Sequence, residues 1–170
     1  CDRRQRQMCI RDRAPRLPEK FPGTPSKENM DYIQGAAYHG SLNAPYDRFF
    51  ISPAHYAAPV YAALIEADRL DEAALEMFNR DGYSMEMIGA NHTPGFENAA
   101  GTLDQAISVA GGTAHARKLR GEEGRVFVMM SDGEMEEGQL WEAIQAAAFY
   151  ELDNLVLLVD INGQQVEGET

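Results

Sequence analysis

One stretch of this 170-residue chain, residues 125–164, constrains the fold more than any other. It holds two short apolar runs, Arg125–Met130 and Leu155–Asp160, which are rich in β-forming residues and too short for helices. Between the runs lie an acidic, glycine-containing turn and a helix-length segment, Gln139–Leu152. This strand–helix–strand order predicts a βαβ unit, whose crossover makes the two strands parallel.

The predicted helix has one apolar face, because its apolar residues recur every three or four positions. That face consists of Trp141, Ile144 and Ala148, flanked by Leu140, Ala143 and Ala147. The run Leu155–Asp160 is apolar on both faces, as expected of a strand inside a parallel sheet that helices cover. We therefore expect an α/β fold, a parallel sheet with helices on both faces.

Two polar side chains follow the predicted strands, Asp132 after the first and Asn162 after the second. Parallel strands place both residues at one edge of the sheet, where α/β folds bind ligands. A carboxylate and an amide supply the oxygen ligands that magnesium prefers, and Gly133 allows a phosphate to approach the backbone. The sequence thus suggests a magnesium diphosphate site.

The alternative, that Asp132 only caps a helix and Asn162 only forms a turn, stays open on spacing alone. An EF-hand calcium loop is excluded, because the alternating ligands are missing.

Three segments, Asp132–Glu142, Leu152–Leu155 and Asp160–Gly168, together resemble the thiamine diphosphate motif of transketolases. The general pattern of the family, Gly-Asp-Gly followed about thirty residues later by Asn, is moderately specific, whereas the added Glu-Gly-Gln-Leu-Trp-Glu and Leu-Asp-Asn-Leu segments are highly specific. One departure is Ser131, which replaces the first glycine of the motif.

The resemblance implies a thiamine diphosphate site with Mg²⁺. Its metal ligands would be Asp132, Asn162 and the main-chain oxygen of Gln164. Gly133 would lie against the diphosphate, with Glu134 near the cofactor but not on the metal. Glu137 resembles the glutamate that links the two active sites of the family's dimer.

Other family segments add candidate residues. The segment Asp47–Tyr56 resembles a strand whose following histidine, here His55, reaches the diphosphate and the substrate. Imidazole suits that role because it can donate to phosphate oxygens or carry protons near neutral pH. The loop Gly89–Glu97 resembles two family elements run together, which makes His92 the candidate substrate-binding histidine, with the register left open. His39 resembles a further motif only loosely, and a turn is the expected role.

The segment Gly101–Ser108 resembles the wall of the family's cofactor site, where Gly101 and Leu103 would touch the cofactor rings. Thr102 and Gln105 have the spacing of a capping box. An apolar stripe follows, with a glycine pair suited to close packing: Leu103, Ala106, Ile107, Ala110, Ala114 and Gly111-Gly112. Three further glycines of the family pattern are replaced in this sequence. Ala54 replaces one in the segment Asp47–Tyr56, and Asp104 and Ala106 replace two in the segment Gly101–Ser108.

The implied activity is transfer of a two-carbon ketol unit between sugar phosphates, with this chain supplying the diphosphate and metal half of the site. The glutamate that activates the cofactor would come from a pyrimidine-binding domain or subunit, in a homodimer or heterotetramer. Two alternatives remain. One is the α subunit of a 2-oxoacid dehydrogenase, and the other is a non-catalytic subunit, or pseudoenzyme, that retains the fold.

The chain divides into a basic leader and proline-rich linker over residues 1–25 and one domain over residues 26–170. We expect the sequence to be a piece of a longer chain, because it ends directly after the cofactor motif. Short helices are predicted at Ser26–Gly35, Pro59–Asp68 and Asp71–Arg80, the last capped by Asp71.

The charge of the chain limits its possible binding partners, and its cysteine and apolar content indicate the kind of protein. The net charge is −12, and it is more negative still without the leader, which carries six Arg and two Asp. Such an acidic body argues against nucleic acid and anionic membranes as partners. Both cysteines, Cys1 and Cys9, lie in the leader, and no apolar run of about eighteen residues is present. We expect a soluble, cytoplasmic protein.

Overall fold

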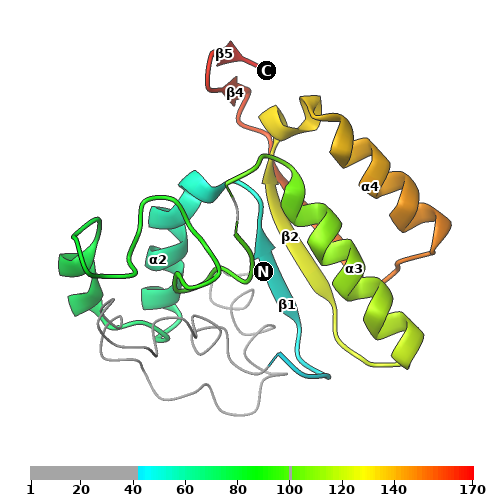
Figure 1. Cartoon of the computed structure of the whole chain (residues 1–170), viewed down its shortest axis with the longest axis horizontal. Coiled ribbons are helices and arrows are strands. Elements are labelled where there is room, and N and C mark those ends of the chain that lie inside the picture. Colours follow the sequence, from blue (N-terminus) through cyan, green and yellow to red (C-terminus); the bar gives the residue numbers. More distant parts are fainter. Residues whose placement is uncertain (1–41, 100) are drawn as a thin grey trace, which may run out of the picture.

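The computed structural model describes residues 42–99 and 101–170. The leader, the linker, the helix predicted at Ser26–Gly35 and His39 lie outside the described residues. The three longest strands form one parallel sheet in the order β1-β2-β3 (Figure 1). Their bounds are Arg48–Ile51 for β1, Val126–Ser131 for β2 and Leu155–Asp160 for β3.

Strand β2 is the centre of this sheet. Its Val126 pairs with Arg48 of β1 on one side and with Leu155 of β3 on the other. Helix α4, Gly138–Phe149, connects β2 to β3. The predicted βαβ unit and its parallel strands are therefore confirmed.

Helices α3, Gln105–Arg120, and α4 cover one face of the sheet (Figure 1). The core on this face joins alternate strand residues to the inner sides of both helices: Phe50, Val126, Val128, Met130, Ala106, Ile107, Ala110, Ala114 and Leu140. Ile144 and Ala143 pack against it. The predicted apolar stripe of α4 was only partly right, because Trp141 and Ala148 face outward and Trp141 is 49 % exposed. The helix also ends before Leu152, since Glu151 adopts a left-handed φ of 52°.

A second core lies on the other face of β1. It is built by a short 3₁₀ turn η3, Ala54–Tyr56, helix α2, Ala57–Glu66, and a second 3₁₀ turn η4, Glu72–Met77. Its buried side chains include Ile51, Tyr61, Leu70, Met85 and Phe96. With helices on both faces, the predicted fold class is confirmed.

The prediction of an α-helix over Asp71–Arg80 was wrong, although the cap was right. Oδ1 of Asp71 accepts from the N–H of Ala73 at 2.9 Å. The segment makes only a 3₁₀ turn, because it buries one residue, Ala74, and leaves Leu75 51 % exposed. Without an apolar face to pack, a helix has little to stabilise it. The chain then turns at Asn79, where φ is 54°.

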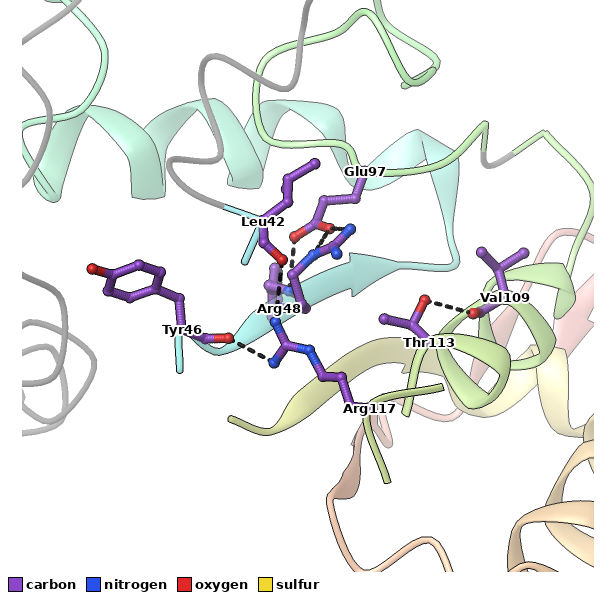
Figure 2. A network of polar contacts seen from close by, with 8 residues as sticks. Leu42, Tyr46, Arg48, Glu97, Val109, Thr113 and Arg117 are labelled. Atoms are coloured by element: carbon purple, nitrogen blue, oxygen red, sulfur yellow. Dashed lines mark hydrogen bonds and ion pairs between the residues drawn. The ribbon is translucent and has the colours of Figure 1, made fainter. Parts of the chain in front are cut away.

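A network of polar contacts fixes the segments that flank β1 (Figure 2). The side chain of Glu97, in the loop before α3, forms an ion pair with Arg48 and accepts from the N–H of Phe49 at 3.1 Å. The guanidinium of Arg117, which is 3 % exposed, donates to the carbonyl oxygens of Tyr46 and Leu42 at 2.7 and 3.3 Å. These contacts hold the loop before α3 and the segment before β1 against the sheet.

The carboxyl ends of the three parallel strands lie at one edge, next to a small hairpin (Figure 1). The hairpin pairs β4, Gln164–Gln165, with β5, Gly168–Glu169. Strand β3 is half-buried rather than fully buried, because it has a paired neighbour on one side only among the described residues. No helix in the described part of the chain is long and apolar enough to cross a membrane.

Candidate functional site

A cleft of about 610 Å³ lies at the carboxyl edge of the sheet. Its walls come from segments at the carboxyl ends of all three strands and from Leu103, two residues before α3. The lining residues are His55, Tyr56, Leu103, Ser131, Gly133, Glu134, Glu136, Glu137, Asn162 and Gln164–Glu167. The topology explains this gathering, because parallel strands bring their carboxyl ends to one edge. Four predicted cofactor-site residues, Leu103, Gly133, Glu134 and Asn162, are thus brought together.

Asp132 directly follows β2, between the cleft-lining residues Ser131 and Gly133, and is 6 % exposed, but it is not itself among the residues that line the cleft. Its Oδ1 accepts from the N–H of Gly133 at 2.9 Å, and its Oδ2 accepts from the N–H of Gly163 at 2.8 Å. The second contact joins the segment after β2 to the segment after β3. Oδ1 also accepts from the hydroxyl of Ser131 at 3.4 Å, so Oδ2 is the oxygen that keeps a lone pair for a cation.

Asn162 and Gln164 lie beside Asp132. Oδ1 of Asn162 accepts from the N–H of Gln164 at 2.8 Å. A Cβ added to Gly133 would stand 3.1 Å from Cβ of Gln165 and 3.6 Å from the carbonyl oxygen of Gln164. A side chain at this position would therefore be tight against Gln165, and the Gln164 carbonyl oxygen lies close to Gly133, next to Asp132 in the chain.

These groups fit a magnesium diphosphate site. A buried carboxylate, an amide oxygen and a main-chain carbonyl form a hard, oxygen-only donor set with one formal charge, which leaves phosphate oxygens and water to complete the coordination. No three His, Cys, Asp or Glu side chains gather as a metal site within the described residues.

Glu134 has a structural role that the sequence pattern does not reveal. Its carboxylate is 1 % exposed and accepts three hydrogen bonds, from the hydroxyl of Ser52 at 2.7 Å and from the N–H groups of Asp104 and Ser131 at 2.9 Å each. Ser52 follows β1, Asp104 precedes α3, and Ser131 is the last residue of β2. Glu134 therefore ties together three walls of the cleft. Only its spacing from Ser131, which fits a capping box, gives a signal in the sequence.

Asp104 is a second buried carboxylate behind the cleft. It is fully buried, and neither oxygen makes a hydrogen bond of ordinary geometry. Burial raises the pKa of Asp104 to about 7, with further contributions from the carboxylates of Glu134 and Glu137, while the main-chain N–H of Leu140 offsets part of the shift. The residue also has a left-handed backbone, with φ of 66°.

The four replaced glycines differ in what they cost the backbone. Ser131 has φ of −100°, an extended conformation that any residue adopts. Of the four, only Asp104 has a positive φ, so only there is the conformational freedom of glycine missing. The capping box expected at Thr102 is absent, because α3 begins at Gln105 with Asp104 as its N-cap residue.

The two candidate histidines lie in different places. His55 is exposed in the cleft, with its ring edge-on to Tyr56 at 4.8 Å between centroids. His92 is not among the residues that line the cleft, and its Nε2 lies 3.0 Å from Oε2 of Glu86. Gly101 is exposed and also stands apart from the lining residues. The structure therefore brings His55, but not His92 or Gly101, to the cleft.

A family match and sequence relatives identify the same family that the sequence resembles. Residues 41–170 match the family described as transketolase, thiamine diphosphate binding domain. The chain is 43 % identical over 146 residues to an uncharacterized transketolase family protein of Sinorhizobium fredii, covering 81 % of this chain and 52 % of that protein. It is 35 % identical over 130 residues to one subunit of the apulose-4-phosphate transketolase of Actinobacillus succinogenes, covering 76 % of this chain and 47 % of that subunit.

Solved structures agree with this assignment. Transketolase from Leishmania mexicana superposes with a TM-score of 0.68 at 27 % identity, over 87 % of this chain and 25 % of that one. The chain thus spans about half the length, or less, of these relatives. It belongs to the transketolase family, and the matched residues 41–170 correspond to the family's thiamine diphosphate binding domain.

Proposed function

We propose that this chain supplies the diphosphate-binding and magnesium-binding half of an active site that transfers two-carbon ketol units between sugar phosphates. The observation that carries the proposal is the cleft at the carboxyl edge, where Asp132, Asn162 and the Gln164 carbonyl converge beside Gly133. When bound, thiamine diphosphate supplies the carbon nucleophile and electron sink that such a transfer requires.

Each polar group of the cleft has a task in this proposal. Asp132, Asn162 and the Gln164 carbonyl hold Mg²⁺, and Gly133 lets the diphosphate lie close to the backbone. His55, exposed in the cleft, donates an N–H to a phosphate or substrate oxygen. Leu103, which is 43 % exposed at the cleft wall, offers an apolar surface to the rings of the cofactor.

The other half of the active site comes from a pyrimidine-binding domain or subunit, which provides the activating glutamate. Two relatives, from Actinobacillus succinogenes and Phocaeicola vulgatus, are named as single subunits of apulose-4-phosphate transketolases, which supports a separate partner polypeptide. The same names support a sugar phosphate as substrate. The assembly would be a homodimer or a heterotetramer.

A non-catalytic subunit is the second candidate, and one observation favours it. Asp104 introduces a buried carboxylate and backbone strain behind the cleft, next to its lining residue Leu103, where the resemblance expects glycine. Ketol transfer by the complete assembly separates the two candidates, because only a functional cofactor site supports turnover.

The metal site is tested by calorimetric titration of thiamine diphosphate into the complete protein at fixed Mg²⁺. We expect Asp132→Asn to abolish magnesium-dependent binding, because the site loses its formal charge. Asn162→Ala should weaken binding by about 10-fold to 100-fold, through loss of one neutral ligand.

The matched control is Asp153→Asn, the same change at a side chain that is 90 % exposed and precedes β3 at the opposite edge of the sheet. It should bind the cofactor like the unmodified protein. Unchanged affinity in Asp132→Asn would overturn the proposed site.

A further inference from the structure

Tyr56 is a cleft residue to which no motif in the sequence points. Its hydroxyl donates to Oδ2 of Asp160 at 3.1 Å and accepts from Nδ2 of Asn162 at 3.4 Å. The same Nδ2 also donates to Oδ2 of Asp160, at 3.2 Å. The three polar groups therefore form a closed triangle around the nitrogen end of the Asn162 amide.

The partners of Asn162 determine where the Oδ1 and Nδ2 atoms of its amide lie. On one side is a carboxylate oxygen of Asp160, which can only accept hydrogen bonds in its charged form. On the other side is the N–H of Gln164, which can only donate and lies 2.8 Å from Oδ1. A flipped amide would place its NH2 against the N–H of Gln164 and its oxygen against Oδ2 of Asp160, so the observed orientation is favoured. Because Asn162 is exposed, water compensates part of the cost of the flip.

This arrangement is non-local in the fold. Tyr56 ends η3, which follows β1, whereas Asp160 is the last residue of β3. Strands β1 and β3 are not neighbours, because β2 lies between them. The tyrosine hydroxyl thus reaches across the end of the central strand, the strand after which Asp132 follows.

We propose that Tyr56 and Asp160 are positioning residues of the metal site, which hold the Asn162 amide with its oxygen turned to the Gln164 side. This inference rests on the proposed function, because the orientation matters for cofactor binding only if Asn162 is a metal ligand. Groups that orient metal ligands commonly change metal affinity by about 10-fold to 100-fold when they are removed.

The two residues should contribute unequally. Asp160→Asn replaces an obligate acceptor by an amide that can also donate, so the Asn162 amide loses its preferred orientation. Tyr56→Phe removes only the hydroxyl and leaves the carboxylate in place. We expect magnesium-dependent affinity for thiamine diphosphate to fall about 10-fold or more in Asp160→Asn and about 3-fold to 10-fold in Tyr56→Phe.

The test uses calorimetry on the complete protein, with thiamine diphosphate titrated at several Mg²⁺ concentrations. Tyr61→Phe is the matched control, because it removes another partly enclosed tyrosine hydroxyl, bonded to the carbonyl oxygen of Glu86, that does not line the cleft. The control should keep the wild-type magnesium requirement even where it lowers thermal stability.

A double-mutant cycle distinguishes positioning from general destabilisation. If Tyr56 acts through Asn162, the effect of Tyr56→Phe on cofactor affinity should vanish in an Asn162→Ala background. Full additivity in that cycle, or unchanged affinity in both Tyr56→Phe and Asp160→Asn, overturns this inference. If this inference fails but Asp132→Asn still abolishes cofactor binding, the proposed function stands. If Asp132→Asn binds the cofactor normally, the proposed function itself fails.

Discussion

Asp104 is the residue at which this chain departs most in energy from the glycine-rich pattern that it resembles. A side chain in the left-handed region of backbone space costs about 1 kcal/mol or more, although Asp tolerates it better than most residues. A buried carboxylate without well-formed hydrogen bonds adds a desolvation cost whenever it is charged. Asp104 carries both costs, since its φ is 66° and it is fully buried.

The raised pKa of Asp104 makes the stability of the protein depend on pH. The native carboxyl group titrates near pH 7, whereas the unfolded one titrates near 3.8. The native state therefore binds more protons than the unfolded state between these values, and stability falls as pH rises through that window. We expect the contribution of Asp104 to be fully favourable below about pH 4 and lost by about pH 8, as measured by urea unfolding across pH.

Two substitutions separate the charge from the backbone. Asp104→Asn removes the charge and keeps the shape, so it should flatten the pH dependence while leaving the left-handed strain. Asp104→Gly removes both, and should raise the free energy of unfolding at about pH 8 further than Asp104→Asn does. An unfolding profile with the same slope between about pH 4 and 7 in both variants and the unmodified protein would contradict this account.

At the level of elements, the loop before α3 is attached to β1 mainly through Glu97. Its carboxylate forms an ion pair with Arg48 and accepts from the N–H of Phe49, with the Glu97 and Arg48 side chains 6 % and 16 % exposed. The pair is partly buried, and removing one partner leaves the other without compensation, which costs about 1–3 kcal/mol. We expect Glu97→Ala to lower the free energy of unfolding by that amount in urea titrations.

Glu122→Ala is the matched control for this prediction, because Glu122 pairs with Arg120 at 3.6 Å and the arginine side chain is 69 % exposed. An exposed pair contributes less than about 1 kcal/mol. Equal losses in the two variants would show that the Arg48–Glu97 pair does not anchor the loop.

The parts of the structure that could be predicted from sequence are those with a local repeat or a dense motif. The period-three-and-four pattern of residues 139–152 and its flanking apolar runs predicted the βαβ unit, and the parallel pairing followed from its crossover. The sequence could not distinguish the 3₁₀ turn η4 from an α-helix, because both begin with the same cap at Asp71. The outcome depends on whether Leu75 packs into the core, which is a tertiary contact.

Contacts between distant segments could not be predicted from the sequence. Asp132, Gly133, Asn162 and Gln164 were candidates because they sit in a recognisable spacing. The bonds from Ser52 to Glu134 and from Tyr56 to Asp160 join residues 82 and 104 positions apart, and no pattern along the chain relates them. Such contacts become visible only once the fold brings the two segments together.

Across the whole molecule, the outer surface of the helical layer is apolar. Trp141, Phe149, Tyr150 and Leu119 are between 48 % and 79 % exposed. A groove of about 470 Å³ between α3 and α4 is lined by small residues that include Gly111, Gly112 and Ala147. The glycine pair does not pack against the sheet, because a Cβ at either glycine would contact nothing within 4 Å among the described residues of this chain, and packing against a partner helix stays a prediction.

We expect the isolated 170-residue chain to show no ketol transfer on common sugar phosphates, since the proposed division of roles assigns the group that activates the cofactor to a pyrimidine-binding half. Adding that half should restore turnover and produce a complex larger than the monomer in sedimentation analysis. Turnover by this polypeptide alone would refute the division of roles. A strictly monomeric profile for the complete, cofactor-loaded protein with its partner supplied would count against the assembly.

The register of the sheet has a consequence for how the chain acquires its structure. Arg48 of β1 finds its partner only at Val126, whereas β2 and β3 are joined by one short helix. Long loops must close before distant strands can pair, which slows that step relative to local contacts. We therefore expect β1 to pair only after β2 has left the ribosome, and the unit of β2, α4 and β3 to form before β1 joins the sheet.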